Sequence, residues 1–521
     1  MTKDQAAYRI AQQTINLHKY SRNRQYYSRP VSGQVFILLV LAGIFLLAPL
    51  SQIIDPQASA DAAYYHIMAT QLHEGNGFVE PFVWNHLKKD QQLNKPTDYW
   101  LPLGIVIYYL FRFVSGAANE IWINILIWSW LSAMVFCEVK KNTGSPVFSI
   151  TTFLMFVFHG LNLFDLFTTD NNAFLAVIGF FFIEGLCSDT VRVKSTACAA
   201  GFYCLLRIEG AVFALSGGIA SYLRLRSTKY LLFYLAIAAI IVLPWALRNY
   251  QVHGTFWPSN SSSLYLSSYG DFFNDKPVLK NSVLEFDAET AKEGFAAAFI
   301  SLLILPSNFI LLPFFIAGML VLRRTGGATA GFMLLVILMC SFIFPLQAKH
   351  GTAQHISAFF YPHFFILTGT GLYKIVNKFG ISRKVALSIA LALVLYNMLA
   401  SFGSVFQMKA VYDSFNQPYK KLFSQIKPHE SEVIISPSPI LVYLLTGCAG
   451  VYAGNLTNST PFQMAEKYNA SLVLTDARKL HKNNLVPENW YLLENSGVLK
   501  LYTNKLTGKN SETEIFLRRT P

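Results

Sequence analysis

Residues 33 to 54 read GQVFILLVLAGIFLLAPLSQII, an apolar run without a charged side chain. Crossing about 30 Å of hydrocarbon takes roughly 20 helical residues, so this run is long enough to span a membrane. Eight further runs have the same character and lie at 119–138, 146–164, 171–188, 229–247, 296–322, 328–346, 355–375 and 385–407. Their succession predicts a polytopic membrane protein that is mainly α-helical.

The composition supports this interpretation. Of the 521 residues, 53% are hydrophobic and only 14% are charged, whereas soluble domains usually carry about 25% charged residues. The net charge of +13 would suggest nucleic-acid binding in a soluble protein. Here the basic residues stand between apolar runs, as the positive-inside rule requires of cytoplasmic loops. We therefore exclude a soluble protein and expect no nucleic-acid partner.

Cysteines and the N-terminus add two expectations. The six cysteines lack metal-ligand spacing, and all but Cys448 lie in or beside apolar runs, so we expect neither a disulfide framework nor a zinc site. The first thirty residues are polar and basic, and no small-residue cleavage site separates them from the run at 33–54. The first run is therefore predicted to be a retained anchor rather than a signal peptide.

Charge placement settles two ambiguous stretches. Residues 100–116 (WLPLGIVIYYLFRFVSG) are broken by Arg112, and 195–223 is too long for one span and contains Arg207 and Glu209. Basic clusters near span ends mark the cytoplasmic side; they are the N-terminus, Lys140 and Lys141, Arg192 and Lys194, Arg224 to Lys229, Arg323 and Arg324, and Lys374 to Lys384. All are cytoplasmic only if 100–116 lies along the outer face and 195–223 forms two short helices that meet outside. This predicts about eleven spans, with the N-terminus inside and the C-terminus outside.

Three segments follow from this topology. Residues 1–32 form a cytoplasmic N-terminal segment, 33–407 a transmembrane domain with outer loops at 55–118 and 248–295, and 408–521 an extracytoplasmic domain. The last segment alternates β-rich runs (432–436, 471–475, 498–502) with helical runs (440–446, 461–468), the pattern of a small α/β domain. It contains no Gly-rich nucleotide-binding loop, so we interpret it as a docking or packing module.

The first outer loop carries the best candidate for chemistry. Apolar and aromatic residues after Asp61 predict a helix on the membrane surface with Asp61 in its first turn. An acid there caps and stabilises a helix N-terminus, which is sufficient reason for it. A carboxylate at the bilayer surface can also accept a proton from a hydroxyl nucleophile. Asp55 competes with Asp61 for that second role.

Four ordered motifs resemble the GT-C membrane glycosyltransferases, particularly bacterial relatives of protein O-mannosyltransferases and the aminoarabinose transferase. They are 61–67 (DAAYYHI) with 75–78 (GNGF) and 96–103 (PTDYWLPL); 168–172 (TTDNN); 206–210 (LRIEG), similar to T-R-P-E-G with Ile208 in place of proline; and 244–250 (PWALRNY) with 254–259 (GTFWPS). The resemblance covers most of the membrane region. It implies the GT-C fold and agrees with a juxtamembrane helix at 100–116.

The resemblance also implies a reaction, namely inverting transfer of a sugar from a polyprenyl-phosphate donor to a hydroxyl of a glycolipid, cell-wall polysaccharide or protein. The reaction would occur on the outer face of a bacterial cytoplasmic (inner) membrane. Asp61 would be the general base and Asp170 the second catalytic carboxylate. The donor phosphate would be bound by Arg207, Arg248, Lys349, His350 and His355. Acceptor contacts are expected from Asp55, Tyr64, Tyr65 and Glu209.

Alternative roles remain open for several of these residues. The alternative for Arg248 is a snorkelling residue at a span end, for Arg207 a structural partner of Glu209 or Asp170, and for the cluster from Lys349 to His355 interfacial solvation. No cofactor is certain: some relatives use a divalent metal, but Asp61, Asp170 and the histidines are scattered along the chain and do not indicate a site. The alternative function is a transporter or flippase of lipid-linked sugars, which would be expected to show repeated halves.

Overall fold

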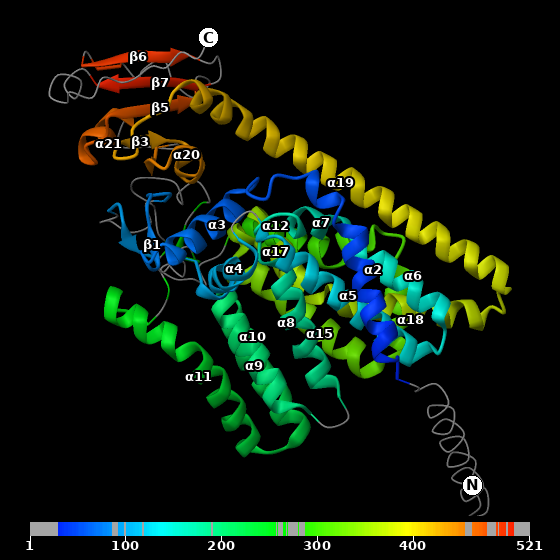
Figure 1. Ribbon diagram of the computed structural model, residues 1–521. Helices are drawn as coiled ribbons and strands as arrows, with labels where there is room; N and C mark the ends of the chain where they lie inside the picture. Colours follow the sequence, from blue (N-terminus) through cyan, green and yellow to red (C-terminus); the bar gives the residue numbers. More distant parts are fainter. Residues whose placement is uncertain are drawn as a thin grey trace, which may run out of the picture.

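The structure is a computed structural model. It describes residues 30–85, 92–97, 100–116, 119–188, 191–256, 258, 264–266, 268, 280, 287–453, 461–476, 486–487, 489–495 and 499–504. The predicted cytoplasmic segment up to residue 29 and half of the predicted outer loop 248–295 lie outside these residues. The described chain forms a large helical domain with a small α/β domain at one end of it (Figure 1). The predicted fold class is confirmed.

Helices of the first half follow the predicted runs closely. They are α2 (Gly33–Leu47), η1 (Leu50–Gln52), α3 (Ala60–His73), α4 (Pro102–Ser115), α5 (Trp122–Thr143), α6 (Pro146–Val157), α7 (Gly160–Leu166), α8 (Asn172–Cys187), α9 (Val193–Leu206), α10 (Gly210–Leu225) and α11 (Thr228–His253). The stretch 195–223 is two helices, as predicted, and the break falls at Arg207–Glu209. A Cβ at Gly210 would lie 2.4 Å from the backbone of Tyr203, so glycine lets α10 begin directly against the end of α9.

Helices of the second half are more often interrupted. They are α12 (Ala288–Phe299), η5 (Ile300–Ile304), α13 (Leu305–Ser307), α14 (Leu312–Val321), α15 (Arg323–Phe342), α16 (Pro345–Gln347), η6 (Ala348–Thr352), α17 (Ala353–Ser357), η7 (Ala358–Phe360), α18 (Tyr361–Lys378) and α19 (Arg383–Gln425). The prediction of one continuous span at 296–322 was wrong, because the chain bends by 94° between α13 and α14. Asn308 and Phe309 have φ of 44° and 61° at the bend, a left-handed conformation that stops a helix.

Exposed apolar surface shows that the helical domain lies in a membrane. Among the described residues, five helices are long and apolar enough to span, or six if the bent pair is one span, and five more apolar helices are shorter. Side chains such as Leu38 (64% exposed) and Phe45 (78%) project from α2 and are mostly exposed. A soluble protein rarely leaves so much contiguous apolar surface in water, so the chain is a multi-pass membrane protein.

The small domain is built on a five-stranded sheet in the order β4-β3-β5-β7-β6. Its elements are β3 (Val433–Ser436), α20 (Pro439–Thr446), β4 (Ala449–Tyr452), α21 (Pro461–Lys467), β5 (Leu472–Asp476), β6 (Trp490–Asn495) and β7 (Leu499–Asn504). β3 is parallel to both β4 and β5, whereas β7 is antiparallel to β5 and β6. The α/β prediction is confirmed, although β4 and β6 were not among the predicted strands.

Helix α19 connects the helical domain to this sheet. It was predicted to end at residue 407, but it continues to Gln425 and runs along the helical domain as far as the sheet (Figure 1). The sheet then packs on the loop 55–118, which was predicted to lie outside: Val83 bridges Val451 at the sheet edge, with Tyr452 N–H donating to the Val83 carbonyl at 2.7 Å. Lys420 on α19 also pairs with Asp55 at 2.6 Å. The small domain therefore holds the loop that contains Asp61.

Candidate functional site

Asp61 lies in the first turn of α3, as predicted, but it does not cap the helix. Ser59 is the N-cap, and its hydroxyl accepts from the Ala62 N–H at 3.1 Å. Because Ser59 supplies the capping oxygen, the purely structural role considered for Asp61 is already filled. The Asp61 carboxylate points to partners elsewhere in the fold.

A second loop, residues 167–171 between α7 and α8, is bonded onto this first turn. The Thr169 hydroxyl donates to the Ala62 carbonyl at 2.6 Å, and the Thr169 N–H donates to the Pro56 carbonyl at 3.0 Å. These bonds join segments more than a hundred residues apart and place Asp170, the next residue, beside Asp61.

Buried polar side chains fix the conformation of Asp170. Tyr108 of α4 donates its hydroxyl to the Asp170 carbonyl at 2.5 Å, and Asn124 of α5 donates to the same carbonyl at 3.2 Å. The Asp170 carboxylate itself accepts from the Asn171 N–H at 2.6 Å. Helix α4, predicted to be juxtamembrane, is thus part of the scaffold that orients the site.

His355 completes the cluster from the other half of the chain. It lies on α17, just after a kink at Gly351, whose φ of 112° favours glycine. Its Nε2 is 3.7 Å from Asp61 Oδ2, and its Nδ1 is 4.0 Å from Asp170 Oδ1. One ligand atom from each of Asp61, Asp170 and His355 lies within 4.8 Å of the others. We call these three residues the carboxylate–histidine cluster.

The electrostatics of the cluster favour a bound proton or cation. Although 35% of the Asp61 side chain is accessible, the surrounding protein removes much of the water from its carboxyl. This burial, and then repulsion by Asp170, raise the pKa of Asp61 to about 7, while Arg207 opposes the rise. Two carboxylates this close cannot both ionise without cost. The proton that Asp61 retains near neutral pH can be replaced by a metal ion or by a hydrogen bond to a substrate hydroxyl.

The donor set fits a divalent metal. Two carboxylates and one imidazole are ligands that suit zinc or manganese, and the separations among them allow one ion to reach all three. The sequence did not indicate this site because its members lie far apart along the chain. His355, which was predicted to bind the donor phosphate, lies between two carboxylates.

Arg207 and Glu209 lie at the break between α9 and α10. Arg207 Nη2 is 3.2 Å from Glu209 Oε1, so the pairing considered from the sequence does form. The pair is nevertheless incompletely satisfied: within the described part of the chain, Arg207 Nε and Glu209 Oε2 are buried and have no hydrogen-bond partner. A buried N–H without a partner is rare and suggests a ligand that would accept from it.

Arg248 connects α11 to the first outer loop. Its Nη1 donates to the Thr97 carbonyl at 2.5 Å, and its guanidinium lies 4.7 Å from the centre of the Trp245 ring. These contacts hold the two-stranded hairpin of β1 (Val79–Glu80) and β2 (Lys95–Pro96) against the helix. The guanidinium is therefore fixed in the protein, which goes beyond the snorkelling role considered for it.

The other predicted phosphate ligands are separated by the kink at Gly351. Lys349, on η6, extends outward and pairs with Glu293 of α12 at 2.8 Å, with about half of each side chain exposed. His350 is also exposed. The structure thus assigns only His355 of this group to the carboxylate–histidine cluster.

The predicted acceptor contacts have structural partners. Asp55 accepts from the Gln57 N–H at 3.0 Å and also pairs with Lys420. The carboxylate of Asp55, the alternative to Asp61 as general base, is therefore engaged by partners within the protein. Tyr64 is fully buried and donates to Glu80 at 2.5 Å. Tyr65 is 2% exposed and accepts from the Asn171 side chain at 2.6 Å. Both tyrosines position the surface helix.

Asp165 and Asn172 were not predicted to belong to the site. Asn172 donates to Asp165 at 2.5 Å, and its side-chain oxygen lies 3.0 Å from His355 Nδ1. The pair therefore orients the imidazole of the cluster, as outer partners of a metal-ligand histidine commonly do. The only signal in the sequence is the density of polar residues in 165–172, which follow a long apolar run.

An apolar groove of about 430 Å³ lies beside the site. It is lined by residues of α4, α5, α8 and α9, namely Leu103, Ile107, Leu126, Ile127, Trp130, Phe174, Val177, Ile178 and Phe202. Phe174 lies in the first turn of α8 and packs against Tyr108, with ring centres 5.4 Å apart. The groove therefore reaches the start of the helix that follows Asp170 in the chain.

Comparison with known proteins gives a match at the level of fold. No protein-family profile matches the sequence, and no curated protein sequence matches it. ArnT from Cupriavidus metallidurans bound to undecaprenyl phosphate is similar, with a TM-score of 0.59 and 11% identity over 91% of this chain and 98% of that chain. The apo state of the same protein gives a TM-score of 0.59 and 10% identity over the same shares. The chain therefore has the GT-C fold that its motifs resemble.

Proposed function

We propose that the chain is an inverting glycosyltransferase of the GT-C class that moves a sugar from a polyprenyl-phosphate donor to a hydroxyl acceptor. The reaction would occur at the outer face of a bacterial cytoplasmic membrane. The acceptor would be a glycolipid, a cell-wall polysaccharide or a protein. The observation that carries the proposal is the convergence of Asp61, Asp170, His355 and Arg207 at one end of a GT-C helical domain.

The reaction needs a proton acceptor and a stabilised leaving group. Asp61 takes the proton of the acceptor hydroxyl as that oxygen forms a bond to the anomeric carbon. The bond from this carbon to the phosphate oxygen breaks, and the polyprenyl phosphate leaves with the electron pair. Attack opposite the leaving group inverts the anomeric configuration. Asp170 holds the acceptor in line with the donor.

Arg207 is the side chain best placed to receive the phosphate. Its positive charge acts on Asp61, and its buried Nε is without a partner among the described residues. A phosphate oxygen would accept from this N–H and would be stabilised by the charge. Glu209 keeps the guanidinium in position at 3.2 Å.

The apolar groove beside Phe174 suits the lipid part of the donor. Its walls are apolar side chains from four helices, and it starts close to the cluster. A prenyl chain could thus lie in the groove while its phosphate reaches Arg207. This placement explains why the donor would be a lipid phosphate rather than a soluble nucleotide sugar.

A divalent cation fits the same scheme. If bound by Asp61, Asp170 and His355, it would neutralise charge on the donor phosphate and on the leaving group. The protein residues would then act around it: Asn172 and Asp165 orient His355, and Thr169 keeps the two carboxylates together.

A transfer assay tests the proposal. Purified protein in lipid nanodiscs would be incubated with radiolabelled polyprenyl-phosphate sugars and a membrane extract as the source of acceptors. We expect transfer of label, and Asp61→Asn should lower the rate about 10²–10⁴-fold because it removes the proton acceptor. NMR of the product should show the anomeric configuration opposite to that of the donor.

The matched control is Asp413→Asn. Asp413 is a partly exposed carboxylate on α19 that pairs with Lys409, so its loss should leave transfer unchanged. Full transfer by the Asp61→Asn protein would exclude Asp61 as the base. Translocation of the lipid-linked sugar without any transfer by wild-type protein would favour a flippase instead.

A further inference from the structure

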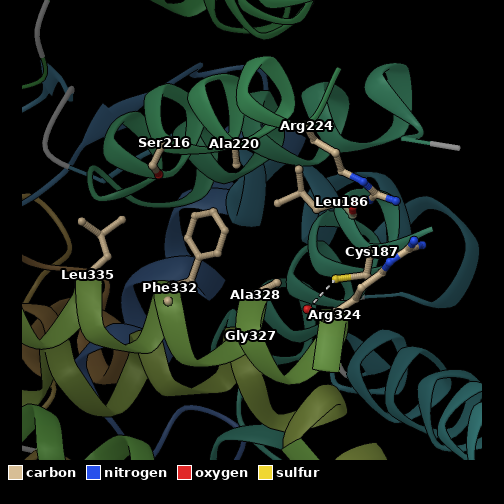
Figure 2. Close-up of a pocket in the computed structure, with 11 residues that line it drawn as sticks. Leu186, Cys187, Ser216, Ala220, Arg224, Arg324, Gly327, Ala328, Phe332 and Leu335 are labelled. Carbon is tan, nitrogen blue, oxygen red and sulfur yellow. Dashed lines mark hydrogen bonds between the residues drawn. The ribbon is translucent and has the colours of Figure 1, made fainter. Parts of the chain in front are cut away.

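A second pocket lies at the opposite end of the helical domain from the carboxylate–histidine cluster. Its volume is about 380 Å³, and α10 and α15 form its walls together with the end of α8 (Figure 2). Helix α8 begins beside Asp170 and ends at Cys187, which lines the pocket. Its 16 residues span about 24 Å at 1.5 Å each. This distance is most of the roughly 30 Å of hydrocarbon, so the pocket lies in the leaflet opposite to the proposed reaction.

Apolar and small side chains line most of the pocket. Phe332 and Leu335 of α15 face Ser216 and Ala220 of α10 across it (Figure 2). Among the described residues, no atom would lie within 4 Å of a Cβ added at Gly327 or Gly331, so these glycines leave the groove open. The walls have the apolar character that an acyl chain requires.

Two arginines stand at one end of this groove. Arg224 and Arg324 both line the pocket, and Figure 2 shows them extending toward the same end of it. Arg224 donates to the carbonyls of Leu186 and Ser188, which fix its guanidinium where α8 ends. An arginine side chain stays protonated in proteins, so Arg224 brings a positive charge to this end of the groove. Arg324 lies in the first turn of α15, where the helix dipole also favours an anion.

We propose that this groove binds an anionic phospholipid of the leaflet opposite to the reaction site. The phosphate would lie between Arg224 and Arg324, and one acyl chain would extend along Phe332 and Leu335. The groove is on the side that the basic clusters predict to be cytoplasmic, where anionic lipids attract clustered Lys and Arg. A pocket that joins two cations to an apolar slot fits a lipid headgroup better than a soluble anion.

Native mass spectrometry of the full-length protein tests this. The protein would be reconstituted with phosphatidylglycerol or phosphatidylcholine in nanodiscs, released into detergent, and examined for retained lipid. We expect retention of about one phosphatidylglycerol and much less phosphatidylcholine. The Arg224→Gln/Arg324→Gln double variant should retain at least about tenfold less. Equal retention by this variant would overturn the proposal.

A second variant keeps the test informative if the loss of Arg224 disturbs folding. Gly331→Leu should fill the groove and displace the lipid, while Gly403→Leu is its matched control. A Cβ at Gly403 of α19 also meets no atom within 4 Å among the described residues, and Gly403 does not line the pocket. Retention by Gly331→Leu equal to that by Gly403→Leu would contradict the proposed position of the acyl chain.

Two competition experiments identify the source of the phosphate. Excess inorganic phosphate should not displace phosphatidylglycerol, because it lacks the chain that fills the groove; displacement would overturn the assignment to a lipid. Polyprenyl phosphate should compete poorly. If it binds more tightly than phosphatidylglycerol, and the arginine variant abolishes that binding, the groove belongs to the donor and the proposal fails. Both outcomes are independent of whether the protein transfers sugar.

Discussion

At the residue scale, the carboxylate–histidine cluster depends on contacts that force like charges together. Thr169 bonds the loop of Asp170 onto the helix of Asp61, and the fold thereby raises the pKa of Asp61 to about 7, through burial first and Asp170 second. Such a pair is costly unless a proton, a cation or a substrate hydroxyl relieves the repulsion. The cost is a reason to assign chemistry to the cluster, since a helix cap alone would not need Asp170 beside it.

Metal binding is the first prediction at this scale. We expect the purified protein, after treatment with a chelator, to bind about one Mn²⁺ or Zn²⁺ per chain in isothermal titration calorimetry. His355→Ala should weaken this binding about 10-fold or more, because it removes one of three ligand groups. The control is His350→Ala, which alters the exposed neighbour on the far side of the kink at Gly351. Identical binding by the two variants would exclude a site at His355.

Arg207 provides the second prediction. Arg207→Lys keeps a positive charge but loses the planar fork and the Nε donor, so the KM for the polyprenyl donor should rise about tenfold. The pairing with Glu209 alone would be largely preserved by lysine, so a merely structural Arg207 would leave the KM unchanged. Arg226→Lys, at the other end of α10, serves as the control and should behave as wild type. Titration of the donor in the transfer assay measures the KM of both variants.

At the scale of elements, a buried ion pair fastens α4. Arg112 Nε donates to Glu120 at 2.5 Å, Glu120 also contacts His66 of α3 at 2.7 Å, and Arg112 and Glu120 are 5% and 1% exposed. Arg112 also donates to Thr70 at 2.7 Å. The charge that interrupts the apolar run 100–116 is thus buried against protein, and it joins α4 to α3 and to the start of α5.

Glu120→Gln should therefore destabilise the protein by about 3–5 kcal/mol, because it leaves Arg112 buried without its counter-charge. The measurement is thermal unfolding in detergent, where a fall in Tm is expected. The double variant Glu120→Gln/Arg112→Met should recover part of the loss. Glu138→Gln removes an i,i+3 pair with Lys141, whose side chain is 59% exposed, and should cost at most about 1 kcal/mol. Similar unfolding of Glu120→Gln and Glu138→Gln would contradict a fastening role.

Helices could be predicted from the sequence where a single property of the sequence, such as the length of an apolar run, determines them. Apolar length gave the helices, and Arg207 with Glu209 marked the break between α9 and α10. Composition cannot report a backbone turn inside an apolar run, so the left-handed residues Asn308 and Phe309 escaped prediction. The extension of α19 to Gln425 escaped for a related reason: its polar second half is helical because it packs beneath the sheet and pairs with the first loop.

At the scale of the whole molecule, the site was predictable only in part. Asp61, Asp170, Arg207 and His355 could be named from motifs, but their proximity depends on tertiary contacts such as Thr169 with Ala62 and the kink at Gly351. The fold also divided the predicted phosphate ligands, because Lys349 pairs with Glu293 on the surface whereas His355 faces the carboxylates. Spacing along the chain carries no information about which residues meet in this way.

The remaining prediction concerns which side of the membrane each loop occupies, because this orientation was assigned from the basic clusters alone. In intact cells, a membrane-impermeant maleimide should label Ser115→Cys at the end of α4 but not Ser382→Cys at the N-cap of α19, in a background without the six native cysteines. Both should react after permeabilisation. Labelling of Ser382→Cys alone in intact cells would reverse the orientation. Since α3 packs against α4 through Arg112, that result would also move Asp61 to the cytoplasmic face. Donor, acceptor and small domain would then have to be cytoplasmic, and the anionic-lipid groove would face the outer leaflet.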